Sequence, residues 1–309
     1  MSDKIQDVIM IGAGPSALAA AIYTTRENIG TVLYEKAIIG GLVATIDKIS
    51  NYPGFPNGIE GLVLAERLEK QAKFFGANIK YGDVKSIRDN GNEKFITIDG
   101  VEINAKTILI ASGRSYGKID VPGELEYFGK GVHYCATCDG AFYKDKKIVV
   151  IGGANSAIQE AIYLTQFASH IDLIVRSTIK ASGILQRDLQ KLIDDDKITV
   201  HLGTSVDEII GFNGHTTSLH ATKNGKSIAI ETDGIFIFVG LKPNTDFLAG
   251  SGIKLDEAGF IKTNSRLQTN IPGIFASGDV RSGATMQIAS AVGEGATAAL
   301  SIREYLHNL

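Results

Sequence analysis

The sequence predicts an α/β protein built from two Rossmann-like, three-layer (ββα) domains, the second inserted into the first. A short apolar strand, a glycine-rich turn and a helix follow one another near the N-terminus. The same order returns in the middle of the chain, and the two turns begin at Gly12 and Gly152. A chain of 309 residues is long enough for two cores. Its 35 glycines and 44% hydrophobic residues are typical of a compact fold with tight strand-to-helix turns.

The first unit opens with an apolar run over 7–11, which predicts a strand buried on both faces. The turn Gly12-Ala13-Gly14-Pro15-Ser16-Ala17 follows, with the pattern G-x-G-x-x-A, and then an alanine-rich helix over 18–26. Between a strand and a helix this pattern favours a dinucleotide site. Gly12 permits the tight turn, Gly14 lets the backbone approach a pyrophosphate, and Ala17 allows close helix–strand contact.

A second strand, over 31–34, ends at Glu35. An acid at this place in a Rossmann unit holds the adenosine ribose hydroxyls. The alternative is an ordinary surface acid. The rest of the first unit is predicted as a helix over 62–75, an alternating antiparallel meander over 80–107, a buried strand over 107–113 and a crossover over 114–120.

The second unit repeats the plan, and its predicted elements are a strand over 147–151, a turn over 152–157, a helix over 158–167, a strand over 171–175, a helix over 185–195, a meander over 199–230, a strand over 234–239 and a crossover over 241–247. A strand over 274–279 and a long helix over 285–306 then return to the first unit. We therefore expect a split domain of residues 1–115 and 245–309, and an inserted domain of residues 116–244. Two connections predict a hinge that permits rigid-body rotation.

The inserted domain contains the only two cysteines, Cys135 and Cys138, in the run Cys-Ala-Thr-Cys-Asp-Gly. Two thiols at this spacing can open and close a small disulfide ring, and the carboxyl group of Asp139 can exchange protons with them. A zinc site needs four ligands, and only His133 and Asp139 lie near. A purely structural disulfide across so short a loop adds little stability. The pattern favours a redox-active dithiol.

Composition excludes several classes of partner. The net charge of −3 gives no electrostatic basis for binding nucleic acid or an anionic membrane. The longest apolar runs are strand-sized, and no signal peptide is expected because the first strand begins almost at once. We therefore expect a cytoplasmic protein, in which a disulfide would be transient and catalytic.

Together, Gly-Ala-Gly-Pro-Ser near the start, Cys-Ala-Thr-Cys-Asp-Gly in the middle and Ile-Phe-Ala-Ser-Gly-Asp near the end make the chain resemble the low-molecular-weight thioredoxin reductases over essentially its full length. The resemblance implies FAD bound without a covalent link, a homodimer, and thioredoxin as the partner. It also implies that Cys138 accepts electrons from the flavin, that Cys135 attacks the partner disulfide, and that Asp139 donates and accepts protons.

The resemblance further implies a set of FAD contacts. Gly12, Gly14, Pro15 and Ser16 would hold the pyrophosphate, Glu35 and Lys36 the adenosine end, and Asp279 the ribityl chain. Residues near the ring system and linker would be Gly41, Leu42, Asn51, Gln287 and Ile288, and the remaining expected contacts are Val84, Gly113 and Gly278.

The inserted domain departs from the family where NADPH would bind. Ala154 stands in place of a glycine, and the family's His-Arg-Arg, followed three residues later by Arg, is replaced by Val175-Arg176-Ser177 and Ala181. Lys180 is one place off. Loss of two guanidinium groups removes charge-assisted bonds to a 2′-phosphate. An acid typical of an NADH site is also lacking, because Val175 stands at the offset from Gly152 that Glu35 has from Gly12.

A third change lies near the expected flavin, where the family's Arg-Gln-Ala is Met286-Gln287-Ile288. These departures resemble the ferredoxin-flavin thioredoxin reductases, which lack the NADPH motifs, and they make NAD(P)H a doubtful cofactor. We therefore expect ferredoxin or another one-electron carrier as the donor. NADH- or NADPH-dependent reduction remains an alternative, as does a flavin-binding regulatory protein without turnover. A ferredoxin–NAD(P) oxidoreductase is disfavoured, because such an enzyme has no use for the dithiol.

Overall fold

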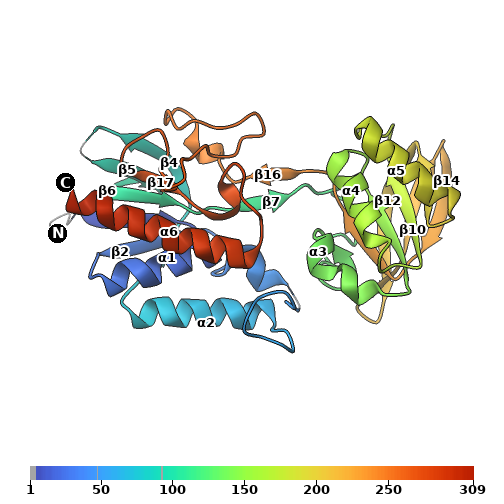
Figure 1. Cartoon of the computed structure of the whole chain (residues 1–309), viewed down its shortest axis with the longest axis horizontal. Helices are drawn as coiled ribbons and strands as arrows, with labels where there is room; N and C mark the ends of the chain where they lie inside the picture. The colour runs from blue at the N-terminus through green and yellow to red at the C-terminus, as the bar shows by residue number, and fades with distance from the viewer. Residues whose placement is uncertain (1–4, 47, 92) are drawn as a thin grey trace. The chain divides into compact units, whose positions relative to one another are not determined.

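The computed structural model describes residues 5–46, 48–91 and 93–309 (Figure 1). Internal contacts divide the chain into two compact units. Unit 1 comprises Met1–Ser115 and Lys242–Leu309, and unit 2 comprises Tyr116–Leu241. Each unit contains parallel strands and a strand followed by a glycine-rich turn and a helix, as the sequence predicts.

The sheet of unit 1 has the order β3-β2-β1-β6-β5-β4, and β17 also pairs with β6. Its strands are β1 (Gln6–Ile11), β2 (Thr31–Glu35), β3 (Asn78–Tyr81), β4 (Val84–Asp89), β5 (Lys94–Ile98), β6 (Val101–Ile110) and β17 (Ile274–Ala276). The central strand β1 is parallel to β2 and β6, and its residues Val8, Ile9 and Met10 are fully buried. A continuous apolar run suits such a strand because both of its faces are covered.

The strand β6 belongs to both the parallel and the antiparallel parts of the sheet. Its first half is antiparallel to β5, and its second half is parallel to β17 along the same edge. The sequence predicted a meander up to 107 and a separate strand over 107–113. The structure instead has one strand, Val101–Ile110, because the residues that pair with β5 continue directly into those that pair with β1.

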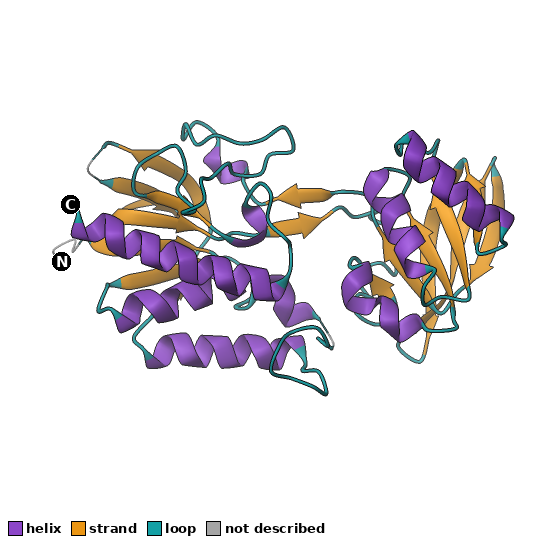
Figure 2. Cartoon of the chain, viewed as in Figure 1, coloured by secondary structure: helices purple, strands orange, loops and turns teal. Residues whose placement is uncertain are grey.

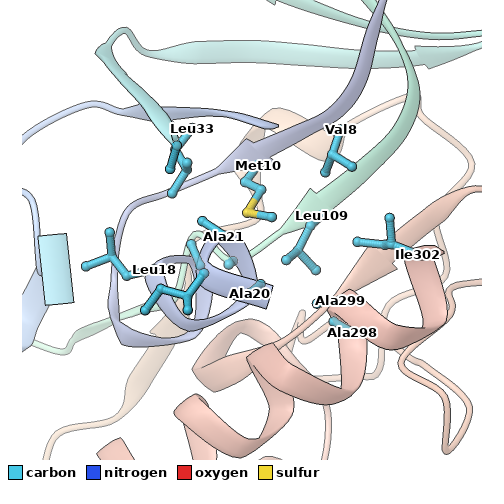
Figure 3. Close-up of a cluster of buried hydrophobic side chains, with 14 of the residues drawn as sticks. Val8, Met10, Leu18, Ala20, Ala21, Leu33, Leu109, Ala298, Ala299 and Ile302 are labelled. Atoms are coloured by element: carbon cyan, nitrogen blue, oxygen red, sulfur yellow. The ribbon is translucent and has the colours of Figure 1, made fainter. Parts of the chain in front are cut away.

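Helices α1 (Pro15–Arg26) and α6 (Ile288–His307) share a core with one face of this sheet, and α2 (Gly61–Phe74) packs beside α1. Figure 3 shows that core, with Met10 and Leu109 on the strands facing Ala20 of α1 and Ala298 of α6. The two helices approach closely at Gly295, where a Cβ atom would lie 2.2 Å from the carbonyl oxygen of Ser16. Small residues are therefore required at this crossing.

Three helix starts differ from the predictions by three residues. Helix α1 begins at Pro15 and α4 (Asn155–Leu164) at Asn155, three residues before the predicted starts, because half of each turn motif forms the first helical turn. Proline favours this position, since its fixed φ suits a helix and its missing N–H group needs no partner there. Helix α6 begins later than predicted, at Ile288, after Met286 in a left-handed conformation (φ +59°).

Unit 2 contains a five-stranded parallel sheet of order β11-β10-β9-β15-β8, with α4 and α5 on one face and the antiparallel sheet β12-β13-β14 on the other (Figure 2). Its elements are β8 (Val132–His133), α3 (Ala136–Asp139), β9 (Lys147–Ile151), β10 (His170–Val175), α5 (Gly183–Asp194), β11 (Ile198–Leu202), β12 (Thr204–Phe212), β13 (His215–Lys223), β14 (Lys226–Glu231) and β15 (Gly234–Ile237). The predicted meander over 199–230 is therefore shorter, because β11 pairs in parallel with β10.

The chain passes between the units twice, through β7 (Arg114–Tyr116) and β16 (Leu241–Pro243), which pair with each other. Short 3-10 helices lie at Gly41–Thr45, Gly140–Tyr143, Asp246–Leu248 and Gly278–Val280. Within the described ranges, no helix is both long enough and apolar enough to span a bilayer.

Candidate functional site

The N-terminus of α1 is open to an anion. Gly12 has φ +99°, and a Cβ atom there would lie 2.5 Å from the carbonyl oxygen of Ala111, so the turn requires glycine. Gly14 is the N-cap residue, no side chain caps the helix, and a Cβ on Gly14 would meet no atom within 4 Å. The space beside Gly14 is therefore open next to an uncapped helix N-terminus, and this arrangement suits a pyrophosphate.

Glu35 is buried at the end of β2, with 8% of its surface exposed. Its two carboxylate oxygens accept hydrogen bonds from the backbone N–H groups of Ala13 and Ala37, each at 2.8 Å. The interpretation as a surface acid is therefore wrong. Each oxygen keeps a second lone pair that can accept a hydroxyl hydrogen from a ligand.

A cavity of about 390 Å³ lies beside Glu35. Its volume suits the nucleoside part of a cofactor. Four of the predicted residues line it, namely Gly12, Glu35, Lys36 and Val84; other lining residues, which the sequence did not point to, include Tyr34, Asp83, Ser112, Asn244 and Phe247.

Ser112 and Asn244 hold one wall of this cavity together. The Ser112 hydroxyl donates to the Asn244 carbonyl oxygen at 2.7 Å, and the Asn244 side-chain amide donates to the Ser112 carbonyl oxygen at 2.8 Å. The backbone N–H of Asn244 also donates to the carbonyl oxygen of Gly113 at 3.0 Å. No local pattern relates two residues so far apart in the chain, so Asn244 could not be found from the sequence.

Other predicted residues gather around the α1 N-terminus. A Cβ on Gly41 would lie 3.6 Å from the Cα of Gly14. The Ser16 hydroxyl lies 2.6 Å from that of Ser277, and a Cβ on Gly278 would lie 3.1 Å from the Cβ of Ser16. The structure thus brings Gly41 and Gly278 to the turn that contains Gly14. These two glycines come from the two separate segments of the chain that form unit 1.

Asn51, Gln287 and Ile288 form a second group at the start of α6. The Asn51 amide donates to the Gln287 side-chain oxygen at 3.2 Å. Gln287 is the N-cap residue of α6, and Ile288 packs against the small core cluster that includes Val43. Leu42 precedes Val43 in the Gly41–Thr45 helix. From the sequence, only the family resemblance predicts that these residues lie together.

Asp279 is paired with Arg114, whose Nε atom lies 3.0 Å from the Asp279 Oδ2 atom. Burial raises the pKa of Asp279, the Arg114 guanidinium lowers it, and nearby Glu294 adds a smaller upward effect. Arg114 is itself buried, with 8% exposed. This guanidinium therefore compensates a charge that burial would otherwise disfavour.

Replacing Arg114 by methionine is expected to destabilise unit 1, since an unpaired carboxylate remains buried. At pH 8 we expect a loss of about 3 kcal/mol in the free energy of unfolding. Without Arg114 the folded-state pKa of Asp279 rises further above its unfolded value, so the folded protein binds the proton more tightly. The loss should therefore be smaller at pH 5 than at pH 8, because protonation of Asp279 removes the unpaired buried charge.

Urea unfolding of the wild-type protein and the Arg114→Met variant at pH 5 and pH 8 measures this difference. Arg88→Met is the matched control, because Arg88 pairs with Glu102 on an exposed surface and such pairs contribute little. An equal loss at both pH values would contradict the assigned role of Asp279.

In unit 2, Cys135 and Cys138 form a disulfide, as the spacing predicted. Cys135 is the N-cap residue of the short helix α3, and its Sγ atom accepts a hydrogen bond from the backbone N–H of Cys138 at 3.2 Å. Both cysteines are partly exposed. Among the described residues, no group of three His, Cys, Asp or Glu side chains is placed to hold a metal ion.

Asp139 has a buried neighbour, His133, which the sequence brings to notice only as a possible zinc ligand. The Asp139 Oδ2 atom lies 3.3 Å from the Nδ1 atom of His133, and the Nε2 atom of His133 lies 2.6 Å from the Tyr143 hydroxyl. Tyr143 was not predicted. Burial, followed by the charges of Asp139 and Asp233, raises the pKa of Tyr143 well above its usual range.

The second glycine-rich turn differs from the first at two equivalent places. Ala154 is the N-cap residue of α4, as Gly14 is of α1, so a methyl group stands where the first turn is open. Val175 is 2% exposed, and a Cβ on Gly153 would lie 2.7 Å from its Cγ1 atom. At the matching place in unit 1, Glu35 binds the backbone of Ala13.

Comparison with known proteins identifies the family. Residues 6–295 match the family described as pyridine nucleotide-disulphide oxidoreductase. The chain is 41% identical to the thioredoxin reductase of Bacillus subtilis, over 99% of this chain and 96% of that protein. It is 33% identical to the "34.2 kDa protein in rubredoxin operon" of Clostridium pasteurianum, over 98% of each.

Among solved structures, the thioredoxin reductase of Streptococcus pyogenes matches with a TM-score of 0.94 and 36% identity, over the whole of both chains. This match confirms the predicted α/β fold with two Rossmann-like domains. The same relatives imply that the cofactor is a flavin, FAD. The chain therefore belongs to the pyridine nucleotide-disulphide oxidoreductase family and, within it, to the low-molecular-weight thioredoxin reductases, which are flavoprotein disulfide reductases.

Proposed function

We propose that this protein takes electrons from a one-electron carrier of the ferredoxin type and passes them through FAD to the Cys135/Cys138 pair. The reduced pair then reduces a thioredoxin-like protein. The disulfide of Cys135 and Cys138, partly exposed and next to Asp139, supports the second step. The altered second turn supports the choice of donor.

Unit 1 contains groups that fit FAD. The open N-terminus of α1 at Gly14 suits the pyrophosphate, and the cavity beside Glu35, Lys36 and Val84 suits the adenosine. Asp279 would bind the ribityl chain. We assign the ring system to the region of Leu42, Asn51, Gln287 and Ile288, with Gly113 and Gly278 shaping the backbone around the cofactor. When bound, FAD exchanges electrons singly with a carrier and in pairs with a disulfide.

The chemistry at the cysteines is a dithiol–disulfide exchange. The Cys135 thiolate attacks one sulfur of the partner's disulfide, so that a mixed disulfide forms and one partner thiolate leaves. The Cys138 thiolate then attacks the Cys135 sulfur, restores the internal disulfide and releases the second partner thiolate. Two protons pass from the enzyme dithiol to the two partner sulfurs, and we propose that Asp139 carries them.

The proposed donor rests on the comparison of the two turns. Val175 packs in the core of unit 2 against Gly153. At the equivalent place in unit 1, Glu35 offers carboxylate oxygens. A buried valine offers no hydrogen bond to a ribose hydroxyl or to a 2′-phosphate. Of the nearby cations, Arg176 and Lys180 are both exposed. Ala154 adds a methyl group where a pyrophosphate would approach.

The Clostridium pasteurianum relative is named for its position in a rubredoxin operon, and we take this name as support for a donor other than a nicotinamide. The competing candidate is reduction by NADH or NADPH, which the family name and the thioredoxin reductase relatives favour. We further propose that the protein acts as a homodimer.

Steady-state turnover with each donor tests the proposal. Purified holoprotein and a thioredoxin are mixed anaerobically with reduced ferredoxin, NADH or NADPH, and new thioredoxin thiols are counted. We expect reduced ferredoxin to support turnover and both nicotinamides to support at least about a hundredfold less. NADPH loses two charge-assisted contacts to its 2′-phosphate, each of which changes binding by about tenfold. NADH finds no acid for its ribose at Val175, and Ala154 opposes the pyrophosphate of either nucleotide.

Two other outcomes would contradict the proposal. Comparable turnover with NADPH or NADH at low concentration would mean that the enzyme is an ordinary nicotinamide-linked thioredoxin reductase. Bound FAD without turnover from any donor would instead support a flavin-binding regulatory protein.

A further inference from the structure

His133 occupies an unusual place for a titratable side chain beside a redox pair. It ends β8 and is buried, with 8% of its surface exposed. Its ring lies against Phe236 and Tyr143, with centroid separations of 5.2 and 5.3 Å. Both ring nitrogens nevertheless have polar neighbours, since Nδ1 lies 3.3 Å from Asp139 and Nε2 lies 2.6 Å from Tyr143.

The hydroxyl of Tyr143 fixes which nitrogen of neutral His133 carries the hydrogen. Burial and two nearby carboxylates raise the pKa of Tyr143, so its hydroxyl stays protonated and can donate to Nε2. The hydrogen of neutral His133 then lies on Nδ1, the nitrogen that faces Asp139. When His133 is protonated, the same hydroxyl can turn and accept from Nε2. Both charge states of the imidazole are therefore satisfied.

We propose that His133, supported by Tyr143, is a positioning residue that orients Asp139 and shares its proton while the Cys135/Cys138 dithiol exchanges with a disulfide. This inference rests on the proposed function of the same cysteine pair. It assigns to this histidine a role in proton transfer that goes beyond filling the core.

The proton balance of the exchange explains why a shared site is useful. The attacking thiol must lose its proton before the sulfur–sulfur bond forms, and the departing partner thiolate gains one afterwards. Between these two events the proton needs a place close to both sulfurs. Asp139 accepts it, and the neighbouring imidazole delocalises the charge of the pair. The proton then returns through Asp139 to the leaving thiolate, so no external acid or base is consumed.

The charges around His133 come from several elements. Asp139 lies on α3, and Asp233 lies on the segment before β15 and acts on Tyr143. Lys146 lies over the Tyr143 ring at 5.7 Å. Asp139 is therefore a direct neighbour of the imidazole, whereas Asp233 and Lys146 act on its hydrogen-bond partner, Tyr143.

Replacing His133 removes the imidazole that lies beside the Asp139 carboxylate. A negative carboxylate beside two thiols disfavours thiolate formation, so the cysteines become less reactive near neutral pH. Loss of the Tyr143 hydroxyl should act in the same direction but more weakly, because the imidazole remains.

The test measures alkylation of the reduced dithiol by iodoacetamide as a function of pH. FAD-loaded wild-type protein and the variants His133→Asn and Tyr143→Phe are reduced with dithiothreitol, desalted anaerobically and alkylated from pH 5.5 to 9. The matched control is His201→Asn, which removes another histidine paired with an aspartate, because His201 Nε2 lies 2.6 Å from Asp172 Oδ1 on strands β11 and β10. Mass spectrometry counts the modified cysteines.

We expect the alkylation rate of His133→Asn at pH 7 to fall by about five- to tenfold and its pH profile to move to higher pH. Tyr143→Phe should move the profile the same way by a smaller amount, and His201→Asn should match the wild type. An unchanged profile in His133→Asn, or an equal shift in His201→Asn, would overturn the proposal. If His133→Asn does not fold, an unchanged Tyr143→Phe profile overturns it.

This readout needs neither an electron donor nor a thioredoxin. A failed donor assay therefore leaves the alkylation result informative, and a failed alkylation result leaves the proposed electron route standing. The two failures can be told apart.

Discussion

Replacing Cys138 by serine is expected to lower thioredoxin turnover by at least about a thousandfold while FAD stays bound. A serine hydroxyl cannot form a disulfide, so electrons on the flavin find no acceptor at this position. Cys135 alone can still attack the partner, but the resulting mixed disulfide has no internal thiol to resolve it. Flavin absorbance reports the bound cofactor, and thiol formation on thioredoxin reports turnover.

Thr137→Ser is the matched control for this variant. Thr137 lies between the two cysteines on α3 and is exposed, so a smaller hydroxyl side chain should preserve the wild-type rate. Turnover of Cys138→Ser at the wild-type rate would exclude the cysteine pair from the electron route.

Replacing Gly12 by alanine is expected to destabilise unit 1 by about 3 kcal/mol or more. The residue has φ +99°, and its Cβ would lie 2.5 Å from the carbonyl oxygen of Ala111. A backbone oxygen cannot move as a flexible side chain does, so β1 and the end of β6 would have to separate. A loss of this size corresponds to a fall of roughly 6–12 °C in Tm for a domain of this size.

Gly14→Ala separates this packing effect from cofactor binding. A Cβ at Gly14 meets no atom within 4 Å, and its backbone is extended (φ −75°), so the protein without FAD should keep its stability. The methyl group should instead weaken FAD binding, because it enters the space where the pyrophosphate approaches. Thermal unfolding without FAD and fluorescence titration with FAD measure the two effects. A Gly12→Ala variant as stable as wild type would contradict the assigned turn geometry.

Local patterns predicted most of the fold. The apolar runs became β1 and β9, and β9 has the predicted bounds because Lys147 and the turn at Gly152 mark its two ends. The double role of β6 could not be read locally, since its pairing with β17 joins residues from opposite ends of unit 1. The helix starts were misplaced because a turn motif and a first helical turn share the same residues.

The same contrast between local patterns and distant pairings explains which residues of the candidate site were predicted and which were missed. Glycine positions and the cysteine pair have fixed local spacings, so sequence reasoning could find them. The partners of Asp279 and Ser112 lie on distant segments, Arg114 and Asn244, and only the fold brings these pairs together. His133 was close enough in sequence to be noticed, but its contact with Tyr143 depends on the short helices after Cys135.

Anaerobic titration of the flavin tests the electron route most directly, because it does not depend on which thioredoxin is the partner. Holoprotein is mixed separately with reduced ferredoxin, NADH and NADPH, and the loss of the oxidised FAD absorbance band is followed. The account predicts that reduced ferredoxin bleaches the band while low concentrations of either nicotinamide leave it unchanged. Rapid bleaching by NADPH or NADH would contradict it, and would show that Ala154 and Val175 are compatible with a working nicotinamide site.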